Sequence, residues 1–275
     1  MGPDPANDRP RPDTPRSLLI TGTDTGVGKT VVTAAIASLL VAAGQRVAVY
    51  KAAQTGVGEG QPDDLAFVQA TVGETPLLRT ACSYRLRAPL APAVAARLEE
   101  VPIDRHEFVR AYHELALSAD TVLVEGAGGL LVPLAADYAM ADLARELALP
   151  LLVVARPGLG TLNHTALTVE VARRRGLEVL GLVISDFPAE PDLATRTNPP
   201  LLVELTAAPL LGALPHVSGL STVEARPGAL AAVARASLAP RLCGGGFNAE
   251  SFLGNLASAT VAPAAAEIAD KDRSQ

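Results

Sequence analysis

The stretch from Ser17 to Val32, SLLITGTDTGVGKTVV, limits the possible folds of this chain more than any other. Its apolar beginning predicts a buried strand, its glycine- and threonine-rich centre a tight turn, and its apolar end the start of a helix. The turn ends in Gly28-Lys29-Thr30, which is the strand–loop–helix setting of a phosphate-binding loop. In such a loop the backbone N–H groups point at phosphate oxygens, and the helix N-terminus adds positive partial charge.

The loop departs from the common phosphate-binding pattern at its first glycine. That pattern leaves four residues between the first glycine and the Gly-Lys pair. Here the expected position holds Thr23, and Gly22 stands one residue earlier. We interpret the segment as a variant loop, in which Lys29 reaches the β- and γ-phosphates and the Thr30 hydroxyl contacts Mg²⁺. The alternative is a glycine-rich turn that binds nothing, and the order of the glycines, the lysine and the threonine disfavours it.

The length, charge and cysteine content of the chain narrow its class. Its 275 residues suit one α/β domain of ordinary size. A formal net charge of −6 argues against a nucleic-acid partner held by charge and against an anionic membrane surface. Cys82 and Cys243 are far apart and form no CxxC pair, so they indicate neither a disulfide framework nor a zinc site. They fit a reducing cytoplasm.

Both ends of the chain are expected to lie outside the folded domain. Residues 1–16 are rich in proline, aspartate and arginine and lack the apolar core of a signal peptide, which predicts a disordered leader. The apolar run over 147–155 is too short to span a bilayer. Residues 243–275 are rich in glycine and alanine and predict a tail without a core. Residues 17–242 are then the α/β domain.

Short apolar segments alternate with helical ones along this domain. Strands are predicted at 18–21, 46–51, 121–125, 150–155, 179–185 and 209–214. Helices are predicted at 28–43, from 63 or 64 onward, and at 93–100, 104–118, 141–147, 161–175 and 228–238. Residues 76–92, rich in proline and arginine, are expected to be irregular. The alternation predicts a three-layer α/β fold of the P-loop NTPase type, with a mostly parallel β-sheet flanked by helices.

Three polar clusters follow predicted strands of this sheet. They are the phosphate loop, the segment Lys51–Thr55 and the segment Glu125–Gly129. Because the carboxyl ends of parallel strands share one edge, we expect the clusters to converge there. Lysines, a hydroxyl and carboxylates around Mg²⁺ suit phosphoryl transfer. The alternatives stay open at this point, since Lys51 could be a surface lysine and Glu125 a residue that caps a turn.

Four motifs in this order resemble those of the ATP-dependent dethiobiotin synthetases, over about residues 17 to 240. They are 22–30, 50–51 with 55–56, 124–129 and 159–164. The resemblance implies an enzyme of biotin synthesis that uses 7,8-diaminopelargonate, CO₂ or bicarbonate, and ATP or another nucleoside triphosphate with Mg²⁺. One substrate amine forms a carbamate, the γ-phosphate phosphorylates it, and the second amine closes a cyclic urea with release of phosphate.

The resemblance also implies roles for single residues around the reacting groups. Lys29 would hold the β- and γ-phosphates, and Lys51 the carbamate and the transferring phosphoryl group. Thr25 would touch the same centre, and Thr55 would bind the substrate near the carbamate. The Mg²⁺ positions correspond to Thr30, Asp64 and Glu125. This favours Asp64 as a metal ligand over the simple helix cap that an aspartate at this place also suits.

Further residues would hold the rest of the nucleotide and the substrate. The residues implied around the phosphates are Gly26, Val27, Gly28, Lys29, Thr30, Val31, Gly126, Ala127 and Gly128. The N-terminus of the helix at Gly160, Thr161, Leu162 and Asn163 would receive the tail carboxylate of the substrate, since helix N-termini favour anions. In the family that contact comes from the other subunit, so a homodimer is implied.

The two turns that would face the nucleotide base depart from the family pattern. The first, commonly Asn-Asp, reads Ser185-Asp186, and the second, often Pro-Trp-Leu, reads Pro215-His216-Val217. An asparagine offers both a donor and an acceptor to an adenine edge, which a serine does not at equal reach. We therefore expect nucleoside triphosphates other than ATP to serve as well.

Other P-loop proteins are the rival interpretations. A switch ATPase of the partitioning or iron-protein type, acting on a protein partner, carries an additional lysine early in the loop, and the stretch 22–25 has none. A synthetase of the amidotransferase type would require a glutaminase domain for which the chain is too short. A nucleotide-binding scaffold without turnover would not need both Lys29 and Lys51.

Overall fold

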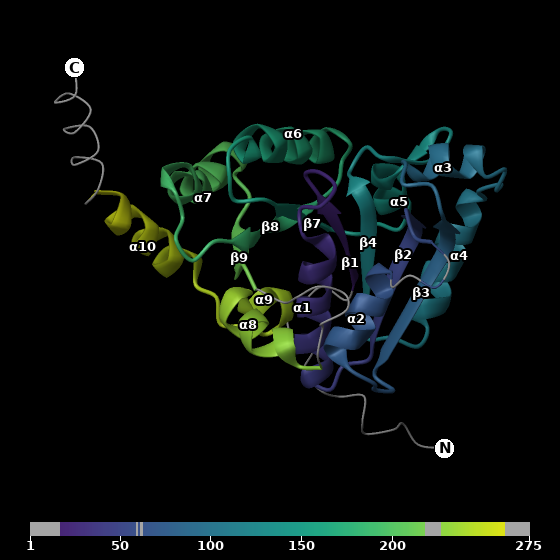
Figure 1. The fold of residues 1–275 in the computed structure, drawn as a ribbon, viewed down its shortest axis with the longest axis horizontal. Helices are drawn as coiled ribbons and strands as arrows, with labels where there is room; N and C mark the ends of the chain where they lie inside the picture. The colour runs from purple at the N-terminus through teal and green to yellow at the C-terminus, as the bar shows by residue number, and fades with distance from the viewer. Residues whose placement is uncertain (1–16, 59, 61–62, 218–226, 262–275) are drawn as a thin grey trace.

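The computed structural model describes residues 17–58, 60, 63–217 and 227–261. Their centre is a parallel sheet of seven strands in the order β3-β2-β4-β1-β7-β8-β9, with helices on both faces (Figure 1). The predicted three-layer α/β fold is therefore confirmed. The sheet strands are β1 (Ser17–Gly22), β2 (Val47–Thr55), β3 (Leu78–Leu86), β4 (Thr121–Gly129), β7 (Leu151–Ala155), β8 (Val179–Phe187) and β9 (Leu210–Pro215).

The central strands are continuously apolar because helices cover both faces of the sheet. In β1, Leu18 and Ile20 face one core and Leu19 faces the other, and none is more than 1% exposed. The first core contains residues of α1 (Lys29–Ala42), α2 (Asp64–Val72) and α8 (Ala229–Ser237). The second contains residues of α4 (Arg105–Ala116), α5 (Met140–Glu146) and α6 (Thr161–Arg174). The phosphate loop thus leaves the middle of a rigid sheet.

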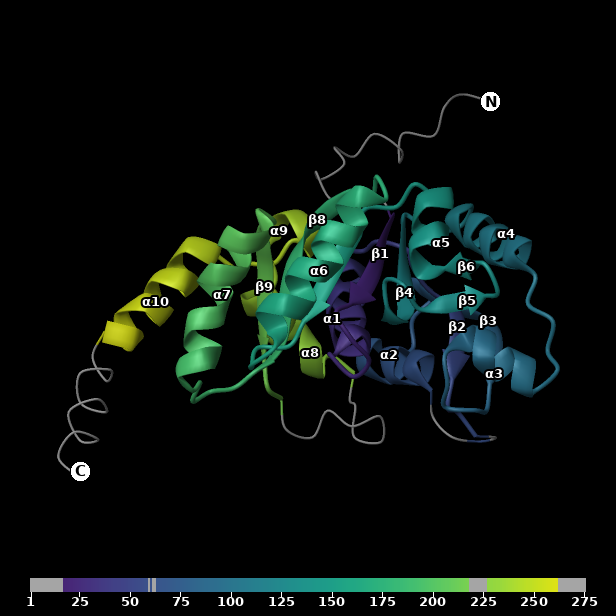
Figure 2. The ribbon, with the colours of Figure 1, turned by 90° about the horizontal axis from the view of Figure 1, so that it is seen from above.

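The remaining elements lie toward the two ends of the sheet. The helices α7 (Leu193–Thr206) and α10 (Ala249–Val261) lie at the β9 end, and α3 (Pro92–Leu98) lies at the β3 end (Figure 2). A short antiparallel pair, β5 (Pro133–Ala135) and β6 (Tyr138–Ala139), follows β4, and α9 (Pro240–Cys243) follows α8. Within the described ranges, no helix combines the length and apolar character that a bilayer span requires.

The expectation of irregular structure over 76–92 is wrong for most of that segment. Residues Leu78–Leu86 form β3, which pairs in parallel with β2 at the edge of the sheet. The prolines that suggested a loop lie outside the strand. Arg79 and Arg85 on this strand are exposed, and charged side chains are typical of an edge strand, because they discourage pairing with other chains.

The helix α7 has no counterpart among the predicted elements. It contains Pro199 and Pro200, and proline both lacks the N–H donor and disfavours helical backbone in the preceding residue. The helix begins directly after Asp192, which caps it: the Asp192 side chain accepts a hydrogen bond from the N–H of Thr195 at 2.7 Å. Packing against α6 thus outweighs a sequence that locally argues against a helix.

The expectation of a coreless tail after residue 242 is wrong for residues 243–261. Phe247 and Leu256 are buried, and the ring of Phe252 on α10 lies 5.4 Å from those of Phe187 and Phe247. A few aromatic and leucine side chains are enough to attach the glycine- and alanine-rich segment to the first core. The predicted leader at 1–16 and the last part of the predicted tail, 262–275, lie outside the described residues.

Candidate functional site

The phosphate loop curls back on itself between β1 and α1. Gly28 precedes the helix with φ +92°, and a Cβ there would lie 2.2 Å from Oγ of Ser185 on β8. A Cβ on Gly22 would lie 2.7 Å from the carbonyl oxygen of Asp24. Both positions therefore need glycine, and the displaced first glycine of the sequence motif is explained by this close approach.

Lys29 is folded over this loop and almost completely buried. Its Nζ donates to the carbonyl oxygen of Asp24 at 3.1 Å, and the residue is 7% exposed. Burial lowers the pKa of Lys29 to about 8, against the opposing attraction of Glu125. A lysine held in this way lacks a full ionic partner, so the loop is prepared for anionic oxygens.

The second lysine lies between two carboxylates beside the loop. The Nζ of Lys51 donates to Oε1 of Glu125 at 3.0 Å and also to the carboxylate of Asp64. The same Oε1 accepts a hydrogen bond from the Thr30 hydroxyl at 2.8 Å. The side chains of Lys51 and Glu125 are 6% and 0% exposed, whereas that of Asp64 is 36% exposed. The predicted convergence of the three polar clusters is therefore present.

Strand register explains why these side chains meet. Lys51 and Glu125 are paired residues of the neighbouring strands β2 and β4, and Glu125 is also paired with Ile20 of β1. Asp64 reaches the same point from another element, because it is the first residue of α2 and Asp63 caps that helix. Asp64 therefore has a contact that a simple helix cap does not explain.

The donor set fits a divalent metal ion. Two carboxylates surround one lysine, and Oε2 of Glu125 is buried without a hydrogen-bond partner. A buried carboxylate oxygen without a partner is costly, and a cation bound to it would remove that cost. Among the described residues no cluster of three or more His, Cys, Asp or Glu side chains could hold a metal alone. The pair of carboxylates, Asp64 and Glu125, matches the way proteins bind Mg²⁺, with one or two carboxylates together with phosphate oxygens and water.

The glycine-rich end of β4 runs beside the phosphate loop. Gly129 is paired with Gly22, and a Cβ on Gly128 would lie 3.2 Å from Oγ1 of Thr25. Gly126 and Ala127 continue the same strand. The small residues of this segment thus lie where backbone can approach a ligand of the loop, and Thr25 is brought to them.

The two turns expected to face a nucleotide base come together at the ends of β8 and β9. Oδ1 of Asp186 and Nδ1 of His216 are 2.6 Å apart, and the backbone N–H of His216 donates to the carbonyl oxygen of Phe187 at 2.8 Å. Pro215 ends β9, and Val217 follows. Ser185 is 2% exposed and faces Gly28, so its hydroxyl is directed to the phosphate loop.

The N-terminus of α6 adjoins the loop through a residue that the sequence did not single out. Nη2 of Arg156 donates to Oδ2 of Asp24 at 3.0 Å and lies 3.3 Å from Nδ1 of His164. Gly160 precedes the helix with φ +87° and is exposed, whereas Thr161 is buried. The predicted tail site is therefore next to the phosphate loop, on the side away from Lys51.

A second unexpected residue, Asn198 on α7, supports the same segment. Its Nδ2 donates to the carbonyl oxygens of Pro157 and Gly158, at 2.8 and 3.2 Å, in the loop that leads into α6. Leu162 packs against the core, and Asn163 is exposed. Nothing in the sequence marks Asn198, because its partners are backbone atoms of a distant loop.

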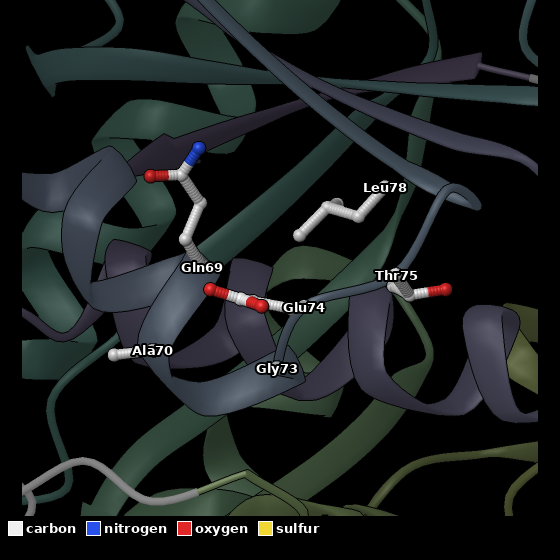
Figure 3. A pocket seen from close by; sticks show the side chains of 6 residues that line it. All are labelled: Gln69, Ala70, Gly73, Glu74, Thr75 and Leu78. Carbon is white, nitrogen blue, oxygen red and sulfur yellow. The ribbon is translucent and has the colours of Figure 1, made fainter.

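Thr55 ends β2 and is not among the side chains that meet at Lys51. It lies four residues further along the strand than Lys51, which is about 13 Å along a regular strand. A separate hollow of about 390 Å³ lies at the far end of α2 (Figure 3). It is lined by Gln69, Ala70, Gly73, Glu74, Thr75 and Leu78, none of which belongs to the predicted site.

The fold and the loop define the class of protein. A parallel sheet whose first strand leads through a Gly-Lys-Thr loop into a buried helix is that of the P-loop nucleoside triphosphatases. A family model described as an AAA domain matches residues 16–224. A ParA family ATPase from Chlorobium tepidum has a TM-score of 0.53 at 14% identity, over 78% of this chain and 91% of its own. The cell division protein MinD of Aquifex aeolicus has a TM-score of 0.52 at 15% identity, over 80% and 94%.

The curated relatives give the family. The ATP-dependent dethiobiotin synthetase of Frankia casuarinae is 51% identical over 86% of this chain and 97% of its own length. That of Saccharopolyspora erythraea is 50% identical over 82% and 97%. The chain belongs to the family of ATP-dependent dethiobiotin synthetases. The likeness to MinD and ParA shows the fold alone, so the relatives favour the synthetase over the switch ATPase.

Proposed function

We propose that this protein makes dethiobiotin from 7,8-diaminopelargonate, CO₂ and a nucleoside triphosphate. The observation that carries the proposal is the position of Lys51, whose Nζ is held between Asp64 and Glu125 beside Thr30 of the phosphate loop. A lysine at this place can attract both a carbamate and a transferring phosphoryl group. Membership of the family supports the same chemistry.

The flanks of the loop suggest how the nucleotide lies. The charged residues Lys51, Asp64 and Glu125 are on the β4–β2 side of β1, so the γ-phosphate belongs there. The nucleoside of the same nucleotide then extends to the β7–β8–β9 side of β1, toward Asp186 and His216 at the ends of β8 and β9. Lys29 leaves the carbonyl oxygen of Asp24 and holds the β- and γ-phosphates.

The reaction proceeds by two attacks at the former CO₂ carbon. One amine of the substrate adds to CO₂ and loses a proton, which gives a carbamate. A carbamate oxygen attacks the γ-phosphorus, and the bond to the β-phosphate oxygen breaks. The second amine then attacks the carbon of the mixed anhydride and loses a proton, phosphate leaves with the bonding electrons, and the cyclic urea is closed. Lys29 and Lys51 stabilise the negative charge of the transferring group throughout.

Mg²⁺ would be held by Thr30, Asp64 and Glu125. The metal supplies charge neutralisation for the β- and γ-phosphates of the bound nucleotide. Thr25 would contact the carbamate and the transferring phosphoryl group, and Thr55 at the end of β2 would bind the substrate near the carbamate. The free thiols Cys82 and Cys243 fit the cytoplasm as the compartment of the enzyme.

The tail carboxylate of the substrate would lie at the N-terminus of α6 of a second subunit. Exposed leucines on α6 and α7 suggest where a second subunit could bind, since Leu167 on α6 is 54% exposed and Leu201 and Leu205 on α7 are 39% and 59% exposed. Leu167→Glu should dissociate the dimer in analytical ultracentrifugation and remove activity. Leu117→Glu is the matched control, since Leu117 is 88% exposed at the end of α4.

Phosphate release tests the proposed reaction. ATP or CTP is supplied with Mg²⁺, bicarbonate and 7,8-diaminopelargonate, and each component is left out in turn. Release that requires both the diamine and bicarbonate supports the carbamate route. The ratio of the rates with ATP and CTP reports how strictly the base is read when Ser185 faces Gly28. Release that does not depend on the diamine would contradict the proposal and favour a switch ATPase.

A further inference from the structure

The two neighbouring aspartates at the start of α2 have different partners. Asp64 contacts Lys51 at the candidate site, whereas Asp63 caps the helix. Oδ1 of Asp63 accepts from the N–H of Ala66 at 2.8 Å, and its Oδ2 accepts from Nε of Arg85 at 2.9 Å. The side chain of Asp63 is 12% exposed, so this carboxylate is enclosed by its two donors.

Arg85 approaches Asp63 from β3, the strand that is paired with β2. In the register of the two strands, Lys51 pairs with Cys82 and Gln54 pairs with Arg85. The start of α2 is therefore held twice from adjacent strands, through Asp64 by Lys51 and through Asp63 by Arg85. A shift of the Arg85 contact would move the backbone on which Asp64 is carried.

We propose that Arg85 is a positioning residue, which holds Asp63 and thereby keeps the Asp64 carboxylate at the metal position beside Lys51. The inference rests on the proposed function, because it takes Asp64 as a ligand of Mg²⁺. Partners that orient a metal ligand typically change metal affinity by about 10- to 100-fold when they are lost. An arginine that only blunts the edge of the sheet would have no such effect.

Metal binding tests the proposal without relying on turnover. Mn²⁺ replaces Mg²⁺, and its binding to the ADP-saturated protein is followed by electron paramagnetic resonance. Asp63→Asn keeps a good helix cap but removes the charge that Arg85 contacts. We expect Arg85→Gln and Asp63→Asn each to raise the Mn²⁺ dissociation constant about 10-fold, and the double variant to raise it no further. Arg85→Lys, which keeps the charge, should fall between Arg85→Gln and the parent protein.

Arg87, the first residue after β3, offers a matched control. Its side chain is 80% exposed and lies 3.8 Å from Glu99, away from α2. Arg87→Gln should leave the Mn²⁺ dissociation constant unchanged, and metal-free ADP binding should be the same in all variants. An unchanged constant in Arg85→Gln, or equal changes in Arg85→Gln and Arg87→Gln, would overturn the role of Arg85.

Asp64→Asn separates this inference from the proposed function. Loss of Mn²⁺ binding in Asp64→Asn with no change in Arg85→Gln would reject Arg85 and keep the metal site. Undiminished Mn²⁺ binding in Asp64→Asn would instead reject the metal position, and the role of Arg85 with it. Phosphate release by the parent protein stays an independent test of the reaction.

Discussion

The two flanks of the phosphate loop are built in different ways. On the β4–β2 flank, charged side chains meet directly, since Lys51 contacts both Glu125 and Asp64. On the β7–β8–β9 flank, the charged pairs Arg156–Asp24 and His216–Asp186 are exposed, and the buried Asn198 donates to the backbone of the loop before α6. The first flank is suited to stabilising charge during a reaction, and the second to presenting backbone to a ligand.

This difference explains which flank could be inferred from the sequence. A lysine or a glutamate at the end of an apolar strand, such as Lys51 or Glu125, is unusual enough to be noticed in the sequence. The parallel register of β2 and β4 then brings these two residues together. A buried asparagine that precedes two prolines attracts no such notice, although it supports the loop before α6. Side-chain chemistry is therefore visible in the sequence, whereas support of a loop by a distant helix is not.

The largest effect is expected on the charged flank, from Lys51→Ala. The variant should bind nucleotide through the intact phosphate loop, but kcat for phosphate release should fall by about 10²- to 10³-fold, as when one group that stabilises developing charge is lost. Nucleotide titration and steady-state phosphate release measure the two properties. Normal turnover in the variant would show that Lys51 takes no part in the mechanism. The two flanks would then not differ in their capacity to stabilise charge during the reaction.

A pH effect is expected from Lys29, which lies between the flanks. Burial lowers its pKa from 10.5 to about 8, so the unfolded chain binds a proton between these values that the folded chain does not. The contribution of Lys29 to the free energy of unfolding therefore rises as the pH increases from about 8 to 10.5. Below this range Lys29 is protonated in both the folded and the unfolded chain. The charged form of Lys29 is needed for phosphate, so the dissociation constant of ADP should rise by up to about 10-fold per pH unit above pH 8.

Isothermal titration calorimetry of the full-length protein with ADP at pH 7, 8 and 9 measures how the dissociation constant depends on pH. Lys29→Arg is the control, because a guanidinium stays charged over the range and should abolish the pH dependence of the dissociation constant. If the parent protein bound ADP with the same dissociation constant from pH 7 to pH 9, Lys29 would not be the residue whose positive charge holds the phosphates.

A smaller effect, of a different kind, is expected from Asn198→Ala on the other flank. The variant leaves the carbonyl oxygens of Pro157 and Gly158 without their buried donor, which should lower the free energy of unfolding by about 1–3 kcal/mol. If this loop positions the N-terminus of α6, KM for the diamine should rise while KM for ATP stays constant. Denaturant unfolding and steady-state kinetics measure both, and an equal rise of the two KM values would show that the flanks are not separate.

The smallest effect on function is expected at the outer end of the same flank. Phe252→Ala removes a ring that packs against Phe187 and Phe247, and it should lower the free energy of unfolding by about 2 kcal/mol, less than for a fully buried phenylalanine. Its kcat should stay unchanged, because Lys51 is on β2 and α10 lies beyond the opposite, β9 end of the sheet (Figure 1). A loss of kcat with unchanged stability would show that α10 influences the site.

The sequence by itself determined the alternation of strands and helices, the phosphate loop and the convergence of Lys29, Lys51, Thr30 and Glu125. These follow from local hydrophobic patterns and from the rule that parallel strands end at one edge. It did not predict β3, α7 or α10, because proline, arginine and small residues there outweigh the local signals of regular structure. Only tertiary packing decided those elements, since their stability comes from contacts with β2, α6 and the first core, as do the positions of Arg85, Arg156 and Asn198.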